Sequence, residues 1–259
     1  MGSSINAYEG DGDGGNLNSV LAEIDPELKS FTLWQALKTS KFYLIFFSFF
    51  IGGGSGVMVI SNLGQIIDGM TGTFQSDVTV FVTIISVCNC WGRLLSGMLG
   101  DYLVKRGHPR PIMLSVAMAL MVVAQVLMIF GSYNMMYVVC TCLGLSYGAF
   151  NALCPTLITE IFGDAHAGSI YATNSLSNGI ASILIGSEMA GALYNHEAHT
   201  PNPSSGGLPW CDSKTCYRSS AIICAIISAC GVGLGLVLSC LTKRRYHAMY
   251  DTVITEKQW

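Results

Sequence analysis

Charged residues are scarce in this sequence. Asp, Glu, Lys and Arg make up 11% of its 259 residues, whereas soluble domains carry about 25%. So few charges cannot give a folded chain of this length a hydrated surface, and the positive mean hydropathy of +0.49 points the same way. The scarcity excludes an ordinary soluble domain and indicates that lipid surrounds most of the chain.

A basic amino-terminal segment is missing as well. Acidic residues crowd the first 30 positions instead, and no Lys or Arg occurs before Lys29. We therefore expect no cleavable signal peptide, because such peptides begin with a positively charged region.

Long apolar runs are abundant. A helix that crosses the hydrocarbon core needs ~20 apolar residues, and the runs found here are far longer than the ~10-residue alternating strands of a membrane barrel. Six runs reach the required length: Phe42–Gln65, Val78–Leu99, Pro111–Phe130, Met135–Leu157, Ala167–Leu193 and Ser220–Leu241. The sequence predicts an all-α integral membrane protein, a six-transmembrane-helix bundle over residues 41–245, followed by a tail at 246–259.

Basic residues concentrate on one side of these spans. The segments on the side of the amino terminus hold ten Lys and Arg residues, whereas the opposite side holds only Lys214 and Arg218. Because basic loops stay in the cytoplasm, we expect both termini to be cytoplasmic, with the protein in the plasma membrane or an endomembrane.

A glycine run, FIGGGSGV, occupies residues 50–57 of the first span. A phosphate-binding loop would need a lysine after the glycines, which is absent. A serine protease would need a base close to Ser55, and no histidine lies deep in a predicted span. We therefore expect no catalytic residues and no enzyme activity. Two interpretations stay open, close helix packing and a transporter hinge, both at Gly52, Gly53, Gly54 and Gly56.

The segment after the second span carries a family signature. The string GRLLSGMLGDYLVKRGHPRP resembles the loop that joins two helices on the cytoplasmic side of major facilitator superfamily proteins. The matching residues are Gly97, Asp101, Arg106, Gly107 and Arg110. Four further stretches resemble the nodulin-like branch of that superfamily, namely GGGSGVMVISNLGQI, PTLITEIFG, AGALYNHEA and CDSKTCYRSSAI.

This resemblance implies half of a transporter. The superfamily fold has two six-helix halves with the substrate between them, and the six spans here resemble helices 7–12, the C-terminal half. Residues 1–40 then resemble the polar, largely disordered cytoplasmic linker, with a short helix before the membrane. The implied partners are the lipid bilayer, a small-molecule substrate, and either a missing N-terminal half or a second copy of the chain. No cofactor and no nucleic acid are expected.

The resemblance also implies secondary transport by alternating access. Arg93 is the one cation expected to be buried in a span, and in the carboxylate carriers that this chain resembles, the matching arginine contacts the anionic substrate. We therefore predict a small organic anion as substrate. Asn89 stands where monocarboxylate carriers have an acid, which argues against proton-coupled monocarboxylate transport. Transport of a metal or metal complex, and a non-transporting six-helix regulator, stay open as alternatives.

Other polar residues complete the predicted sites. The substrate pathway is predicted to contain Arg93, Asn89, Asn62, Gln65, Tyr147, Asn151, Tyr171, Asn174 and Asn178. The last three follow i, i+3, i+7 spacing and share one helix face, although hydrogen bonding between helices would also explain them. A cytoplasmic gate is predicted from Asp101, Arg106, Arg110 and Glu160.

Two cysteines stand apart in the connector before the last span. Cys211 and Cys216 lie on the side predicted to face an oxidising compartment, so we predict a disulfide between them. A metal site with His196 and His199 would be the rival, but the spacing fits no known zinc pattern, and no metal site is expected.

Overall fold

The computed structural model describes residues 30–71, 78–197, 200–201, 209–210 and 217–256. Within them the only strands form one short antiparallel ribbon, and six helical segments are long and apolar enough to cross a membrane. The elements are α2 (Leu33–Leu37), α3 (Ser40–Ser61), α4 (Leu63–Thr71), α5 (Val78–Lys105), α6 (Pro111–Ile129), α7 (Tyr133–Phe162), α8 (Ala167–Ala181), η2 (Ser182–Met189), α9 (Ala190–Glu197), β1 (Thr200–Pro201), β2 (Pro209–Trp210) and α10 (Arg218–Glu256). The predicted fold class is confirmed.

Several helix ends differ from the predicted spans. The first span was expected to continue to Gln65, but α3 stops at Ser61, because Asn62 adopts φ −104°, ψ 10° and the chain restarts as α4. The fifth span contains a π-helical segment, η2, between α8 and α9. The last helix continues to Glu256, so the predicted start of the tail at 246 lies inside α10.

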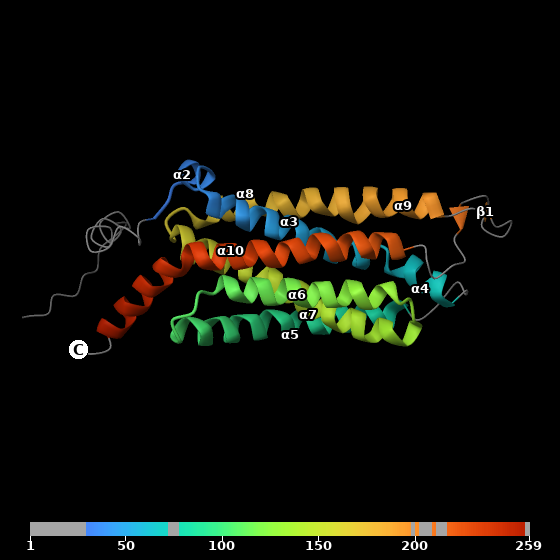
Figure 1. Ribbon diagram of the computed structural model, residues 1–259, viewed down its shortest axis with the longest axis horizontal. Coiled ribbons are helices and arrows are strands. Elements are labelled where there is room, and N and C mark those ends of the chain that lie inside the picture. The colour runs from blue at the N-terminus through green and yellow to red at the C-terminus, as the bar shows by residue number, and fades with distance from the viewer. Residues whose placement is uncertain (1–29, 72–77, 198–199, 202–208, 211–216, 257–259) are drawn as a thin grey trace, which may run out of the picture.

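The helices follow a definite order across the bundle. α5 packs on α7, α7 on α6, α6 on α10, α10 on α3, and α3 on α8 and η2. α3 is the most enclosed span and α5 the least, with 56% and 17% of their apolar windows buried. In Figure 1, α5 and the α8–α9 segment lie at opposite edges of the bundle. Both edge helices therefore leave much of their surface uncovered by this chain.

The glycine run of α3 is a packing centre. All four glycines are buried inside a continuous helix, and each has one large side chain of a neighbouring helix against it. The pairs are Gly52 with Phe150, Gly53 with Asn178, Gly54 with Ile185 and Gly56 with Tyr147. Any Cβ at these positions would overlap its neighbour, so the glycines permit the close approach of α7, α8 and η2. The structure supports the packing interpretation, and the hinge stays a prediction.

The contact between α5 and α7 also depends on glycine. A Cβ on Gly92 would overlap the backbone carbonyl of Leu145, and one on Gly144 would lie 2.7 Å from the carbonyl oxygen of Ile85. These are backbone atoms, so no side-chain rotation could make room. The two helices approach as closely as small residues allow, as is common for helices in membranes.

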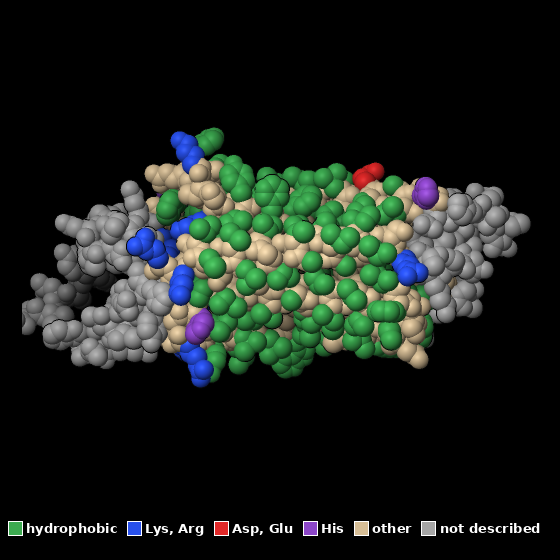
Figure 2. Space-filling view, in the orientation of Figure 1, with side chains coloured by type: hydrophobic (Ala, Val, Ile, Leu, Met, Phe, Trp, Pro, Cys, Tyr) green, Lys and Arg blue, Asp and Glu red, His purple; other side chains and the backbone are tan. Residues whose placement is uncertain are grey.

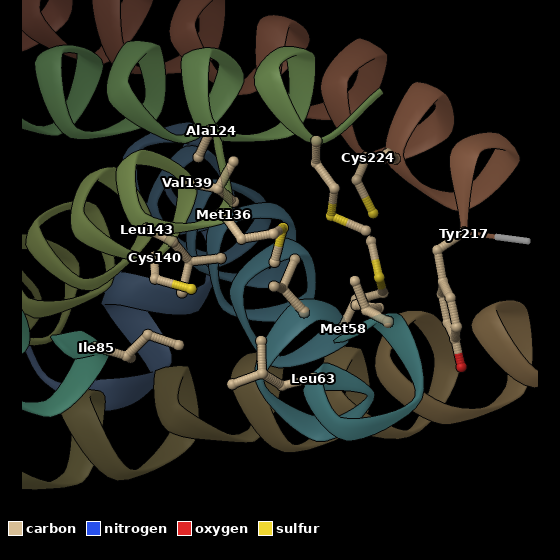
Figure 3. Close-up of a cluster of buried hydrophobic side chains, with 14 of the residues drawn as sticks. Met58, Leu63, Ile85, Ala124, Met136, Val139, Cys140, Leu143, Tyr217 and Cys224 are labelled. Atoms are coloured by element: carbon tan, nitrogen blue, oxygen red, sulfur yellow. The ribbon is translucent and has the colours of Figure 1, made fainter. Parts of the chain in front are cut away.

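Two apolar clusters fill the interior. One packs near α4 and α9, and Figure 3 shows Met58, Leu63, Met136 and Cys224 converging there from different helices. The other lies near α2 and includes Phe42 and Phe162. Outside the core, the face formed by α6 and α10 is apolar along its middle, with Lys and Arg side chains toward its ends (Figure 2). This distribution fits a face that contacts lipid.

A glycine-to-alanine change tests the α5–α7 contact. We expect Gly92→Ala to lower the unfolding free energy by about 1–3 kcal/mol, because the new methyl group must push α7 away. Thermal unfolding in detergent measures this. Gly97→Ala, on the same helix with nothing within 4 Å of the added Cβ, is the matched control and should not destabilise. Equal stability of the two variants would contradict the packing account.

Candidate substrate pathway and ion-pair cluster

The exposed surface of α5 divides into a polar and an apolar stripe. Thr83, Ser86, Cys90 and Arg93 are exposed and follow the spacing of one helix face. On the adjoining face of α5 the exposed side chains are large and apolar: Val80, Val87, Trp91, Leu94 and Met98. Arg93 therefore shares its face with small polar residues and the exposed Val82, beside the apolar stripe.

The position of Arg93 corrects one expectation. It was predicted to be a buried cation, but its side chain is exposed in the described chain, where its Nε donates to Asn89 Oδ1 at 3.0 Å. The reason is the edge position of α5, which packs on α7 through residues such as Ile85 and Gly92 and leaves its polar stripe uncovered.

The polar stripe of α5 faces away from α6. Leu95 and Leu99, on the opposite side of α5, line an apolar cavity together with Val116 and Leu120 of α6. The apolar side of α5 is thus the side toward α6, and Arg93 lies on the other.

The polar residues of α7 also lie on the side turned away from α6. Ser146 donates to the carbonyl oxygen of Ala117 on α6 at 2.7 Å. By helical geometry, Tyr137, Thr141 and Asn151 lie on the opposite side of α7, and all three are exposed or half-buried. We call this side of the bundle the open face. It is turned away from α6 and carries Thr83, Ser86 and Arg93 of α5 and Tyr137, Thr141 and Asn151 of α7.

α8 contributes a third polar stripe to the open face. Along α8 and η2 the exposed or half-buried polar residues Tyr171, Ser175, Asn178 and Ser182 follow one face. The exposed apolar residues Leu176, Ile180, Ile183 and Leu184 follow the other face, together with Ser169 and Thr173. Asn174, by contrast, is only 1% exposed. The predicted Tyr171, Asn174 and Asn178 set therefore spans a buried and an open position of one helix.

A cavity of about 150 Å³ brings these residues together with α7 and α3. Four residues of the predicted pathway line it, namely Asn151, Tyr171, Asn174 and Asn178. The rest of its lining is Phe49, Cys154, Ser175 and Ser177. It is the place where the predicted pathway residues converge most closely among the described residues.

Some of the polar atoms that line the cavity have hydrogen-bond partners and others have none. Asn174 Nδ2 donates to Cys154 Sγ at 3.2 Å, and Asn151 Nδ2 donates to the Tyr147 carbonyl at 2.8 Å. Asn174 Oδ1 and Asn178 Oδ1 are buried and accept no hydrogen bond within the described chain. The Tyr171 hydroxyl and Asn178 Nδ2 also have no hydrogen-bond partner in the described chain, so the cavity has unused hydrogen-bonding groups of both kinds.

Asn62 and Gln65 do not join this cavity. Asn62 Nδ2 donates to the carbonyl oxygens of Met58 at 2.7 Å and of Gly186 in η2 at 3.0 Å. The Tyr217 hydroxyl, at the start of α10, donates to Gln65 Oε1 and lies 3.4 Å from Asn62 Oδ1. Burial raises the pKa of Tyr217 above its usual value, which keeps this donor protonated. These residues tie α3, α4, η2 and α10 together at one end of the bundle.

The glycine run places Ser55 among hydrogen-bonding neighbours. Ser55 Oγ accepts from Ser228 Oγ of α10 at 3.1 Å, and its carbonyl accepts from Gln125 Nε2 of α6 at 3.1 Å. The serine thus links three helices. Cys211 and Cys216, the predicted disulfide, lie outside the described residues.

The other end of the bundle holds a charged cluster around Arg110. This arginine is 8% exposed, and it pairs with Asp101 at 2.7 Å and with Glu160 at 2.8 Å. Glu160 Oε2 also accepts from the Tyr246 hydroxyl at 2.6 Å, and its carbonyl accepts from Arg245 Nε at 2.6 Å. The cluster connects the end of α5, the start of α6, the end of α7 and α10.

The structure thus brings together three of the four predicted gate residues. The fourth, Arg106, lies over the ring of Tyr102, 4.5 Å from its centroid.

Comparison with known proteins identifies the family. The sequence pattern of the Major Facilitator Superfamily matches residues 45–252. The chain belongs to the major facilitator superfamily. Its relatives also support the predicted nodulin-like branch, and the six spans are consistent with half of the superfamily fold.

Three relatives illustrate the similarity. The chain is 29% identical over 198 residues to the "Probable transporter MCH1" of Yarrowia lipolytica, covering 72% of this chain and 39% of that protein. It is 27% identical over 215 residues to the "Protein NUCLEAR FUSION DEFECTIVE 4" of Arabidopsis thaliana, covering 81% and 36%. It is 24% identical over 157 residues to the "Uncharacterized MFS-type transporter YhjX" of Escherichia coli, covering 60% and 38%. The chain spans less than two fifths of the length of these relatives.

Sequence reasoning missed Tyr217, Arg245 and Tyr246 as partners of the site residues. Tyr246 lies 86 positions from Glu160, and such a long-range contact leaves no local pattern. The run of basic residues before Tyr246 indicated only the cytoplasmic end of a span. In this superfamily member, α10, which lies outside the signature loop, therefore supplies part of the charged cluster.

A tyrosine-to-phenylalanine change tests the link between α10 and Glu160. We expect Tyr246→Phe to lower the unfolding free energy by about 2 kcal/mol, because a hydrogen bond to a charged group is lost in a buried site. Denaturation of the purified chain in detergent measures it. Tyr43→Phe is the control, because Tyr43 is 49% exposed. A loss no larger than that of the control would show that the contact contributes nothing.

Proposed function

We propose that this chain is the C-terminal six-helix half of a secondary transporter, which moves a small organic anion by alternating access. One observation carries the proposal, the concentration of polar side chains of α5, α7 and α8 on the open face while the α6–α10 face is apolar. A bundle surrounded only by lipid has no reason to sort its surface in this way.

The energetic argument rests on Arg93. A charged side chain near the middle of a bilayer costs about 2.5–3.5 kcal/mol or more, and its hydrogen bond to the neutral Asn89 leaves the charge uncompensated. An aqueous or protein-covered open face removes this cost. The covering unit is a second set of six helices, either the missing N-terminal half or another copy of this chain, and both termini are cytoplasmic.

Arg93 supports an anionic substrate in particular. Only its Nε is engaged, by Asn89, and no described Asp or Glu forms an ion pair with it. A guanidinium has five N–H donors in a planar fork, which matches the two oxygens of a carboxylate. The free donors would bind substrate directly from the open face.

The remaining predicted residues take supporting roles in this proposal. Opening and closing of the Asp101–Arg110–Glu160 cluster gates the cytoplasmic side, because breaking it frees α10 from the loop between α5 and α6. The glycines of α3 allow α8 to shift over α3 as the gate moves. Transport of a metal is not favoured, since the described residues hold no group of three His, Cys, Asp or Glu side chains that could bind one.

Uptake by proteoliposomes tests the anion contact. The protein is reconstituted with the six-helix unit that completes it, or alone if it pairs with itself, and uptake of labelled lactate, malate and gluconate is measured. We expect Arg93→Ala to reduce uptake at least tenfold, and Arg93→Lys to reduce it less. Arg244→Ala, which removes an exposed arginine near the end of the last span, is the control. No anion uptake by the wild type would favour the non-transporting regulator.

A further inference from the structure

The cavity between α3, α7 and α8 keeps several polar groups without a hydrogen-bond partner. Besides the two asparagine contacts described above, Ser175 Oγ donates to the Tyr171 carbonyl at 2.9 Å and Ser177 Oγ donates to the Asn174 carbonyl at 2.6 Å. The groups left without a partner in the described chain are the Tyr171 hydroxyl, Asn178 Nδ2 and two buried amide oxygens. Asn174 Oδ1 is the clearest case, because the residue is 1% exposed and this oxygen has no partner in the described chain.

A buried acceptor without a partner costs free energy, so a site that keeps one gains when a donor arrives. Turning the Asn174 amide around would not remove this cost. Cys154 Sγ, which accepts from Nδ2 at 3.2 Å, can also donate to the amide oxygen, and one polar atom of the amide would still lack a partner. The oxygen of Asn178 packs against Gly53 of α3, which leaves Asn174 as the clearest polar group for a ligand to meet. The cavity therefore favours a ligand group that forms hydrogen bonds.

The charge of that ligand group follows from the lining. No Asp, Glu, Lys, Arg or His lines the cavity, so an ammonium or carboxylate placed there would be buried without a counter-charge. An alcohol hydroxyl donates a hydrogen bond without bringing a charge. At about 150 Å³ the cavity has room for roughly five water-sized groups, each taking about 30 Å³.

The cavity and Arg93 lie at similar depths. Arg93 precedes the end of α5 by 12 residues and Asn178 follows the start of α8 by 11 residues, or about 18 Å and 17 Å at 1.5 Å per residue. These two helix ends lie at the same end of the bundle, and α5 and α8 stand at its opposite edges (Figure 1). A solute on the open face thus meets a cation on one side and acceptor oxygens on the other.

We infer that this cavity binds a hydroxyl group of the transported solute, so that the substrate class is hydroxylated carboxylates. The carboxylate is held at Arg93 and the hydroxyl-bearing end at Asn174. This assignment rests on the proposed function for the carboxylate end, whereas the hydroxyl subsite stands on the cavity alone.

Competition between matched acids tests the inference. Unlabelled gluconate and hexanoate, and likewise lactate and propionate, are compared as inhibitors of Arg93-dependent anion uptake. We expect the hydroxylated member of at least one pair to compete at about one tenth the concentration of its partner, because the deoxy acid leaves the acceptor unpaired. This comparison uses the wild type, so it does not depend on a variant folding.

Two variants locate the effect. Asn174→Leu should remove the preference for the hydroxylated acid while Arg93-dependent uptake persists, and Asn134→Leu, an exposed asparagine at the start of α7, should keep the preference. Equal competition by both members of each pair in the wild type overturns the inference but leaves the anion proposal intact. Absence of Arg93-dependent uptake removes the proposed function.

Labelling of Cys154 tests the subsite without transport. Cys154 lines the cavity, so with the other nine cysteines replaced its reaction with methyl methanethiosulfonate reports occupancy. We expect gluconate or lactate to slow labelling several-fold in lipid nanodiscs and the deoxy acids to have no effect. Failure of both hydroxylated acids to protect would overturn the hydroxyl subsite even in a working anion carrier.

Discussion

In a bilayer no water is available to a polar group, so each polar side chain of a span must be paired within the protein or turned toward an aqueous side. This constraint orders the whole structure. Ser55, Gln125 and Ser228 are paired with one another inside the bundle, and the α6–α10 face is left apolar. Most of the polar side chains that α5, α7 and α8 do not bury lie on the open face, where a second six-helix unit and its water-filled cleft would meet them. Ser169 and Thr173 lie on the apolar side of α8 instead, and Thr173 donates to the Ser169 carbonyl.

Close packing of the helices determines where the candidate site forms. The glycines of α3 bring α8 near enough for Asn178 to rest on Gly53, and Asn174 is buried beside Cys154 as a result. At the end of the bundle where α5 stops and α6 starts, Arg110 and its partner Glu160 tie four helices into one unit. The bundle is thus tightly joined at its end and carries its open polar cavity nearer the middle, an arrangement suited to a rocking half of a carrier.

The sequence predicted the spans well because a run of apolar residues is a local property. It also grouped Tyr171, Asn174 and Asn178 on one helix face by their spacing, and all three line the same cavity. It could not predict that Arg93 is exposed, because burial depends on which helix packs beside α5. Nor could it predict the contact of Tyr246 with Glu160 or the break at Asn62, which depend on partners far along the chain.

Accessibility to water of the open face tests the central claim most directly. Single cysteines are placed at two adjacent pairs, Ser86 and Val87 on α5 and Ser175 and Leu176 on α8, in a cysteine-free protein in native membranes. A small membrane-impermeant thiol reagent should label the positions of Ser86 and Ser175 and spare those of Val87 and Leu176. Labelling of neither polar position, or equal labelling within each pair, would contradict the account, because the open face would then contact lipid.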